Sequence, residues 1–385
     1  MRTPNEFENI RPYNPDELPA VYEELLKDKN FQVAITAVYP RPFDYIVEKM
    51  KKCRTNLEFQ KAFIYKYLKG LMAEKSDGFT NDFSAITDKE KNYVFMSNHR
   101  DIVMDPALLS VALIDNGMNT VEIAIGDNLL TIPWVKHLVR ILKSFIVKRG
   151  LTGREHLQAM QLMSRYINFA VNEKGENIWI AQRQGRAKDS DDRTQEGVLK
   201  MLSMACKGSP AEKLKGMHIV PTALSYEYDP CDFLKAAEFQ RRRDNENFKK
   251  EPTEDIISMK TGIFGYKGHV HFQAAPCIDD FLTQLEKQEL PKAEFMNKVA
   301  THIDHEIFRN YRFFPVNYVA LDLMNGDKSH SDHYYPEDLE KFEKYISERI
   351  DQIDSIEEKD KDRPYLREKF IEMYANPLKN FLELV

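Results

Sequence analysis

The fold is indicated most clearly by residues 93–106, which read YVFMSNHRDIVMDP. The run 93–96, rich in aromatic and β-branched side chains, predicts a strand. Polar residues follow it directly. Asp105-Pro106 then fits the start of a helix, because Asp is a favoured capping residue and Pro is favoured in the first helical turn. A strand that leads through a polar turn into a helix is typical of α/β folds.

Similar apolar runs recur along the middle of the chain. The further predicted strands lie at 121–125, 145–147, 178–181, 219–224 and 269–273, the last after a polar break at 241–255. The predicted helices between them lie at 106–114, 134–142, 154–171 and 196–206. Strands that alternate with helices predict an α/β fold, with a mixed, largely parallel sheet wrapped by helices.

The two ends of the chain have a different pattern. The N-terminal part is charge-rich with helical spacing and closes with a turn-rich stretch at 76–92. From about residue 279, acidic and basic residues alternate around apolar stripes, as on packed helices with a solvated outer face. We therefore expect three regions: a helical region at 1–88, an α/β domain at 89–280 and a helical region at 281–385.

Composition excludes several classes of protein. The chain has 385 residues, of which 42% are hydrophobic, so it can bury a core. Lys plus Arg total 55 against 61 Asp plus Glu, and this balance argues against a nucleic-acid partner. The four cysteines form no C-x-x-C pair, which fits a reducing cytoplasm. No apolar run approaches the roughly 20 residues of a bilayer span, so we expect at most attachment to a membrane surface.

A candidate general base follows the first strand. In doubly wound sheets, functional groups collect beyond the carboxyl ends of the strands. His99 stands at such an end, with Asp101 two residues on and Asp105 six residues on. A carboxylate bonded to one imidazole nitrogen fixes the tautomer and leaves the other nitrogen to accept a proton. The alternative is that the acids cap the following helix and that His99 is a turn residue.

Cationic and amide groups follow two other strands. They are Lys148 and Arg149 after 145–147, and Gln184, Gly185, Arg186 and Lys188 after 178–181. Cations at strand ends can hold a phosphate, and a glycine permits close backbone approach. Exposure to solvent is the alternative for the Lys-Arg pair. Three strand ends on one rim predict an anionic substrate brought to a general base.

In order and spacing, these segments resemble the four sequence blocks of the glycerol-3-phosphate and lysophosphatidic acid acyltransferase superfamily, over about residues 90–280. The first block, His-x4-Asp, is similar to residues 98–105, and the second is similar to 126–133 followed by the basic strand ending at Arg149. The third block, Glu-Gly-x-Arg, is similar to 184–186. The fourth, an apolar strand with Val-Pro, is similar to 219–226.

The sequence departs from the family pattern at two places. Six positions separate His99 from Asp105, where the family has five, and Met104 stands at the fifth. We favour Asp105 as the orienting acid, because the family's acid sits at the helix start, and we keep Asp101 as the alternative. In the third block, Gln184 stands at the position of the glutamate, and the arginine follows the glycine directly.

The resemblance implies transfer of a fatty acyl group from acyl-CoA or an acyl-carrier protein to a hydroxyl of glycerol-3-phosphate or 1-acylglycerol-3-phosphate in phospholipid synthesis. His99 would be the general base, no cofactor would be needed, and backbone amides near Gly126 or Gly185 would stabilise the oxyanion. The residues implied in substrate binding are Arg100, Asn128, Lys148, Arg149, Gln184, Gly185, Arg186 and Lys188. Apolar residues at 129–138 are candidates for an acyl groove, although a core role is favoured for them.

Two alternatives keep the same fold. One is a non-catalytic lipid- or acyl-carrier-binding protein, and the other is an acyltransferase with a different lipid acceptor. Lipid substrates also imply peripheral attachment at the inner face of a membrane, and segment 131–145 has a composition that suits either an interfacial or an internal helix. Three histidine pairs, 269/271, 302/305 and 330/333, lack a third ligand nearby in sequence, so we predict no metal site. The oligomeric state stays open.

Overall fold

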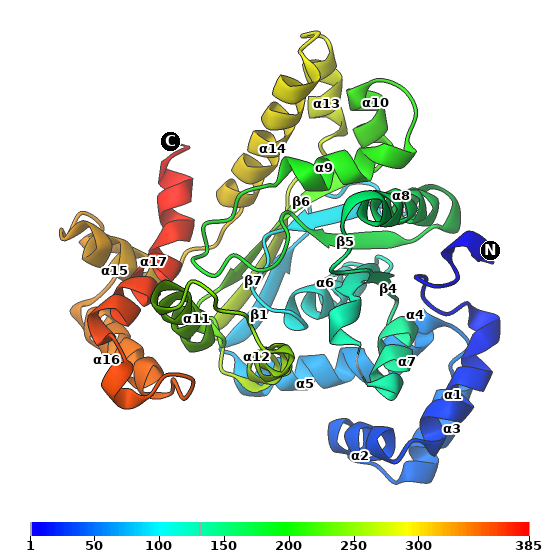
Figure 1. Ribbon diagram of the computed structural model, residues 1–385, viewed down its shortest axis with the longest axis horizontal. Helices are drawn as coiled ribbons and strands as arrows, with labels where there is room; N and C mark the ends of the chain where they lie inside the picture. Colours follow the sequence, from blue (N-terminus) through cyan, green and yellow to red (C-terminus); the bar gives the residue numbers. More distant parts are fainter. Residues whose placement is uncertain (1, 131, 385) are drawn as a thin grey trace.

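The computed structural model of the protein describes residues 2–130 and 132–384, without the side chain of Pro252. A sheet of seven strands lies at its centre, in the order β1-β7-β6-β2-β5-β3-β4 (Figure 1). The strands are β1 (Gly78–Asp82), β2 (Val94–Ser97), β3 (Val121–Gly126), β4 (Ser144–Val147), β5 (Asn177–Ala181), β6 (Ile219–Tyr226) and β7 (His269–Ala274). Every neighbouring pair is parallel except β6 with β7. The predicted mixed, largely parallel α/β fold is therefore confirmed.

The register of the sheet brings the predicted strand ends together. At the end of the central strand β2, Ser97 pairs with Ala181 of β5 on one side and with Thr222 of β6 on the other. Gly126 of β3 likewise pairs with Val147 of β4. The loops that follow β2, β4 and β5 consequently leave the sheet at one edge.

Helices cover both faces of this sheet and both of its sides. They are α1 (Leu18–Lys27), α2 (Lys29–Val38), α3 (Phe43–Lys52), α4 (Asn56–Phe59), α5 (Lys66–Lys75), α6 (Met104–Asp115), α7 (Pro133–Ile141), α8 (Gly153–Phe169), α9 (Glu196–Leu202), α10 (Pro210–Lys215), α11 (Asp232–Asp244), α12 (Pro252–Phe264), α13 (Asp279–Glu286), α14 (Lys292–Arg309), α15 (Pro315–Asn325), α16 (Pro336–Asp351) and α17 (Arg363–Leu382). The helices predicted between the strands correspond to α6, α7, α8 and α9.

Successive residues of β2 point to opposite faces of the sheet, as in any strand. Val94 and Met96 pack into a core with α8, α9, α13 and α14. Phe95 packs into a second core with α5 and α6. The site-bearing strands are thus held between two apolar layers.

The terminal helices form two smaller cores on opposite sides of the sheet (Figure 1). Helices α1–α3 pack against α7, and α15–α17 pack together with α11. The three-region division stays a prediction. Strand β1 belongs to the sheet, although it lies in the predicted turn-rich stretch. Helices α13 and α14 cover a face of the sheet, although they lie at or near the start of the predicted C-terminal region.

The polar break predicted at 241–255 is too long, because α11 extends to Asp244 and α12 begins at Pro252, so only 245–251 lies outside the helices. Its three consecutive arginines lie on α11 and are neutralised there. Arg241 pairs with Glu254, Arg242 with Glu238, and Arg243 with Asp244 and Asp362. Among the described residues, no helix combines the length and the apolar character needed to cross a bilayer.

Candidate active site

A histidine and a buried carboxylate meet just beyond β2. His99 Nδ1 lies 2.8 Å from Asp105 Oδ2. Asp105 is completely buried in the first turn of α6. Its carboxylate also accepts the backbone N–H groups of Arg100 (2.6 Å) and Asp101 (3.0 Å) and the hydroxyl of Tyr226 (2.9 Å). A carboxylate fixed in this way holds Nδ1 as the protonated nitrogen of His99 and leaves Nε2 to accept a proton.

Trp179 completes the setting of the imidazole. The two rings meet edge to face, with their centroids 5.2 Å apart. The indole Nε1–H of Trp179 donates to Ser97 Oγ at 2.9 Å, so the indole is itself held in place. The His99 ring is therefore oriented by a hydrogen bond on one edge and by an aromatic contact on its side.

Asp101 caps a helix and does not contact His99. Its Oδ1 accepts the backbone N–H groups of Val103 (2.8 Å) and Met104 (2.7 Å), and so caps the start of α6. Asp105, six residues beyond His99, reaches the imidazole. The geometry thus favours Asp105 over Asp101 as the partner of the imidazole.

Burial, together with the nearby Asp105 carboxylate, raises the pKa of Asp101 from 3.8 to about 6. The folded protein then binds more protons than the unfolded chain between about pH 4 and pH 6, so its stability falls as the pH rises through that range. Asp101→Asn keeps the capping oxygen but removes the titrating group. We expect the free energy of unfolding of the variant, relative to that of wild type, to rise by about 3 kcal/mol from pH 4 to pH 7. Urea unfolding at both pH values measures this, and identical pH dependence in the two proteins would contradict it.

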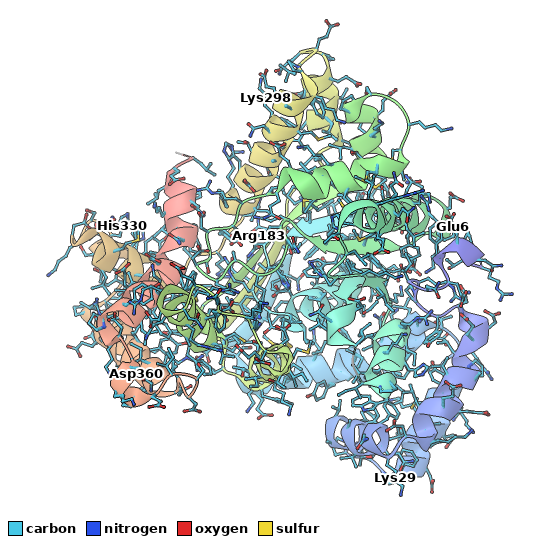
Figure 2. The ribbon with its side chains drawn as sticks, viewed as in Figure 1. Glu6, Lys29, Arg183, Lys298, His330 and Asp360 are labelled. Atoms are coloured by element: carbon cyan, nitrogen blue, oxygen red, sulfur yellow. The ribbon has the colours of Figure 1, made fainter. Side chains whose placement is uncertain are left out.

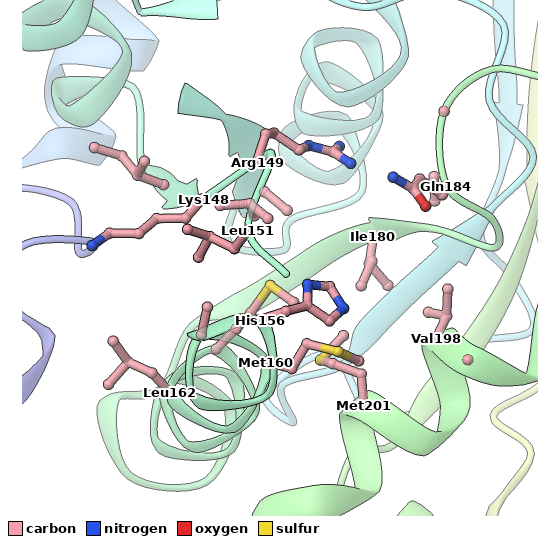
Figure 3. A pocket seen from close by; sticks show the side chains of 18 of the residues that line it. Lys148, Arg149, Leu151, His156, Met160, Leu162, Ile180, Gln184, Val198 and Met201 are labelled. Carbon is pink, nitrogen blue, oxygen red and sulfur yellow. The ribbon is translucent and has the colours of Figure 1, made fainter. Parts of the chain in front are cut away.

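A cavity of about 810 Å³ opens beside His99, between strands β3–β5 and helices α8 and α9. Its polar lining includes His99, Lys148, Arg149, Arg183, Gln184 and Gly185. Its apolar lining includes Ile146, Met160, Leu162, Met163, Ile180, Val198 and Met201. Figure 3 shows Arg149 and Gln184 facing each other across the polar end, and Met160, Leu162 and Met201 at the other end. A volume of this size suits a ligand larger than a sugar phosphate.

Four of the predicted substrate-binding residues line the cavity: Lys148, Arg149, Gln184 and Gly185. Lys148 and Arg149 are exposed, and neither forms an ion pair within residues 2–130 and 132–384. Their charges are therefore available to an anion. In Figure 3 the Arg149 guanidinium points toward Gln184, whereas the Lys148 side chain points away from it.

The other four lie outside the cavity, which corrects the expectation that all the polar groups share one rim. Arg100 is buried and pairs with Asp192 at 2.6 Å, and Lys188 pairs with Glu238 of α11. Asn128 and Arg186 are not among the residues that line the cavity. Arg100 is turned toward Asp192 of the loop after β5, and Lys188 is turned toward α11, directions that spacing in sequence does not specify.

Sequence reasoning missed several residues of the cavity. Arg183 lies near the middle of the molecule (Figure 2) and lines the cavity from the loop after β5. Arg183 directly precedes Gln184 in the basic stretch after β5, and this position in the sequence could have identified it as a candidate. His156 and Glu155 line the cavity from the first turn of α8, far from any strand end. The apolar candidates at 129–138 do not line it, and Trp134 and Leu138 pack against the core of α1–α3, which confirms their core role.

The histidine pairs have other partners. His269 contacts Glu227 and His330 contacts Asp322, each at 2.7 Å, and His302 stacks on Phe281. Three groups of potential metal ligands exist among the described residues: His218, Cys277 and Asp279; Asp77, Glu227 and His269; Asp322, Asp327 and His330. None of these residues lines the cavity.

Comparisons with known proteins found a matching family model and similar solved structures. Residues 80–225 match the family model described as Acyltransferase. The crystal structure of the 1-acyl-sn-glycerophosphate (LPA) acyltransferase PlsC from Thermotoga maritima is similar over 71% of this chain and 95% of that chain, with 13% identity and a TM-score of 0.36. No curated protein matches the sequence.

The matched segment runs from β1 to β6 and contains the His99–Asp105 pair and every polar residue named above in the cavity lining. The four sequence blocks predicted the same superfamily. Residues 80–225 are therefore similar to the acyltransferase family.

Proposed function

We propose that the protein transfers a fatty acyl group from acyl-CoA or an acyl-carrier protein to a hydroxyl of glycerol-3-phosphate or 1-acylglycerol-3-phosphate in phospholipid synthesis. The observation that supports this most is the position of the His99–Asp105 pair. His99 lines the same cavity as the cations Lys148 and Arg149 and the apolar side chains of β4, α8 and α9. The cations suit a phosphate, the apolar side chains suit an acyl chain, and His99 supplies a proton acceptor in the same cavity.

The chemistry follows from the orientation of His99. Nε2 accepts the proton of the acceptor hydroxyl as its oxygen attacks the thioester carbonyl. The tetrahedral intermediate collapses, the carbon–sulfur bond breaks, and the thiolate leaves with the proton from the imidazolium. Asp105 stabilises the imidazolium while it exists. No acyl-enzyme is formed in this scheme.

The negative oxygen of the intermediate needs a hydrogen-bond donor. Gly185 lines the cavity with φ at +74°, a conformation that residues with a side chain rarely adopt. Its backbone can therefore come close to the substrate, and we assign its N–H as the candidate oxyanion donor. Gly126 does not line the cavity.

Arg149 is the cation we assign to the acceptor phosphate. Its removal is expected to raise KM for glycerol-3-phosphate about tenfold or more, because a charge-assisted bidentate contact contributes roughly 1.5–3 kcal/mol. The effect on kcat should be smaller. The matched control is Arg154→Ala, an exposed arginine close in sequence that does not line the cavity. Steady-state kinetics with varied acceptor decide the point, and equal KM values for Arg149→Ala and wild type would refute the assignment.

The apolar end of the cavity is proposed to hold the acyl chain. Val198, half-buried on α9, lines it. A tryptophan at this position would occupy part of the volume, so we expect Val198→Trp to lower kcat/KM for palmitoyl-CoA at least tenfold relative to octanoyl-CoA. A thermal melt checks that the variant is folded. An unchanged preference between the two donors would place the acyl chain elsewhere.

Product analysis tests the function itself. The protein is incubated with palmitoyl-CoA and with either glycerol-3-phosphate or 1-acylglycerol-3-phosphate, and the products are identified by mass spectrometry. Appearance of the acylated acceptor supports the proposal. Products only with other lipid acceptors would support the alternative acyltransferase. Binding of lipids or acyl-carrier protein without any product would support the non-catalytic alternative.

A further inference from the structure

Exposed apolar side chains gather on one helix next to the candidate active site. Ile256, Ile257, Phe264 and Tyr266 are 39%, 49%, 55% and 47% exposed, and all lie on α12 or directly after it. We call these four residues the α12 patch. Single exposed apolar residues are normal on a soluble protein, but a contiguous group marks an interaction surface.

Helix α12 exposes apolar side chains to water and buries small and polar residues. Ser258 and Gly262 are buried against the body of the protein, whereas Ile257 and Phe264 point outward. An ordinary surface helix buries its apolar stripe and exposes its polar one. The exposed apolar face of α12 therefore indicates a binding surface for an apolar partner.

The helix also lies against the catalytic loop. A Cβ atom on Gly262 would come within 1.7 Å of Asp101 Oδ2, so only glycine lets α12 approach the loop after β2 so closely. Helix α12 packs against the turn Asp127–Leu129, where Asp127 Oδ1 accepts the backbone N–H of Arg149 at 3.0 Å. In the view of Figure 1, α12 lies between α11 and α7. Helix α12 thus contacts both the loop that follows His99 and the turn that holds the backbone of Arg149.

The charges on α12 fit an interface with lipid headgroups. Its acids Glu254 and Asp255 are neutralised by Arg241 and Lys250. Lys260 lies one turn from Ile257 and from Phe264, is exposed, and forms no ion pair within the described residues. A lysine between apolar side chains can bury its stem while its ammonium group stays at the headgroups.

We propose that the α12 patch docks the protein onto a phospholipid bilayer, so that a lipid acceptor reaches His99 without leaving the membrane. The inference rests on the proposed function for its choice of a bilayer. A second copy of the chain fits less well, because four side chains fall far short of the roughly 800 Å² per partner that a stable protein interface buries. Apolar side chains with interspersed cations are the composition of helices that lie in a membrane interface.

Vesicle binding tests the proposal without any substrate. Wild type, Ile257→Ser/Phe264→Ser and Val33→Ser/Tyr45→Ser are sedimented with vesicles of phosphatidylethanolamine and phosphatidylglycerol. The second variant is the matched control, because Val33 and Tyr45 are exposed apolar residues on α2 and α3, with exposed fractions of 72% and 49%. We expect the α12 variant to lower the partition coefficient about tenfold or more and the control to stay within about twofold of wild type.

Three outcomes would overturn the docking site: wild type that does not bind vesicles, an α12 variant that binds like wild type, or a loss confined to the α2–α3 variant. A fourth such outcome comes from sedimentation velocity: if wild type is a dimer and the α12 variant is a monomer, the α12 patch binds a second copy of the chain instead of a bilayer. Acyl transfer from palmitoyl-CoA to glycerol-3-phosphate without vesicles is expected to be unchanged in the α12 variant. Because vesicle binding needs no turnover, a failure of the proposed function leaves this test intact.

Discussion

Replacing His99 by alanine is expected to lower kcat for acyl transfer by about 10²–10⁴-fold, the usual contribution of a positioned general base. KM for donor and acceptor should change little, because the cations and the apolar wall of the cavity stay in place. Initial rates of thiol release from palmitoyl-CoA, with glycerol-3-phosphate as acceptor, measure both parameters. The fold is expected to remain, since the side chain of His99 makes one hydrogen bond, to Asp105.

A second histidine provides the control for this variant. His156 lines the same cavity but forms no ion pair with a carboxylate among the described residues. His156→Ala should therefore keep most of the activity. If His99→Ala retained wild-type kcat, or if only His156→Ala lost it, the general base would have been assigned to the wrong imidazole.

Replacing Asp105 is expected to affect both catalysis and stability, and two substitutions separate the two effects. Asp105→Ala leaves two backbone N–H groups and the Tyr226 hydroxyl buried without their acceptor. Each such group costs about 1–3 kcal/mol, so a loss on the order of 3 kcal/mol or more in the free energy of unfolding is expected. Asp105→Asn keeps one acceptor oxygen and the shape of the side chain, and should be much less destabilised.

The asparagine variant isolates the catalytic role of the charge. Its amide oxygen can still accept the Nδ1–H of His99, but it no longer stabilises the imidazolium, so we expect kcat to fall about 100-fold or more. Urea unfolding and initial rates are measured on the same preparations. Asp101→Asn is the matched control and should keep near-wild-type kcat, because Asp101 caps α6 and does not contact His99. The opposite ranking of the two asparagine variants would give the orienting role to Asp101.

The central strands could be predicted from the sequence because they are short, apolar and followed by polar turns. Strand β1 was not recognised. It reads GFTND, lies at the edge of the sheet and has no buried residue, so no apolar pattern marks it. Helices α11 and α12 were missed for a related reason. Arg241 of α11 pairs with Glu254 of α12, and Arg242 pairs with Glu238 within α11, so this stretch is dense in charged residues and reads as a polar loop in the sequence.

The candidate site was predictable to the extent that it depends on strand ends. The positions of His99, Arg149 and Gln184 follow from the parallel register of the sheet. The choice between Asp105 and Asp101 does not, because it depends on which carboxylate caps α6 and which one faces the imidazole. The cavity lining from α8 could not be predicted either. Which face of that helix borders a cavity is set by the packing of α8 against α9 and the sheet.

The positions of charged residues in the sequence were likewise a poor guide to substrate contact. Arg149 and Lys188 both follow a strand end and look equivalent in sequence. In the structure one lines the cavity, and the other is held by Glu238 of α11. A neighbouring helix that supplies an acid therefore decides whether a lysine or arginine is available to an anionic substrate.

The most direct test of the account is acceptor-dependent thiol release from palmitoyl-CoA by wild type and His99→Ala. Wild type is expected to release free thiol only when glycerol-3-phosphate or 1-acylglycerol-3-phosphate is present, with one acylated acceptor formed per thiol, and His99→Ala is expected to show almost none. No acceptor-dependent release by wild type, with palmitoyl-CoA or with a palmitoyl-acyl-carrier protein as donor, would contradict it.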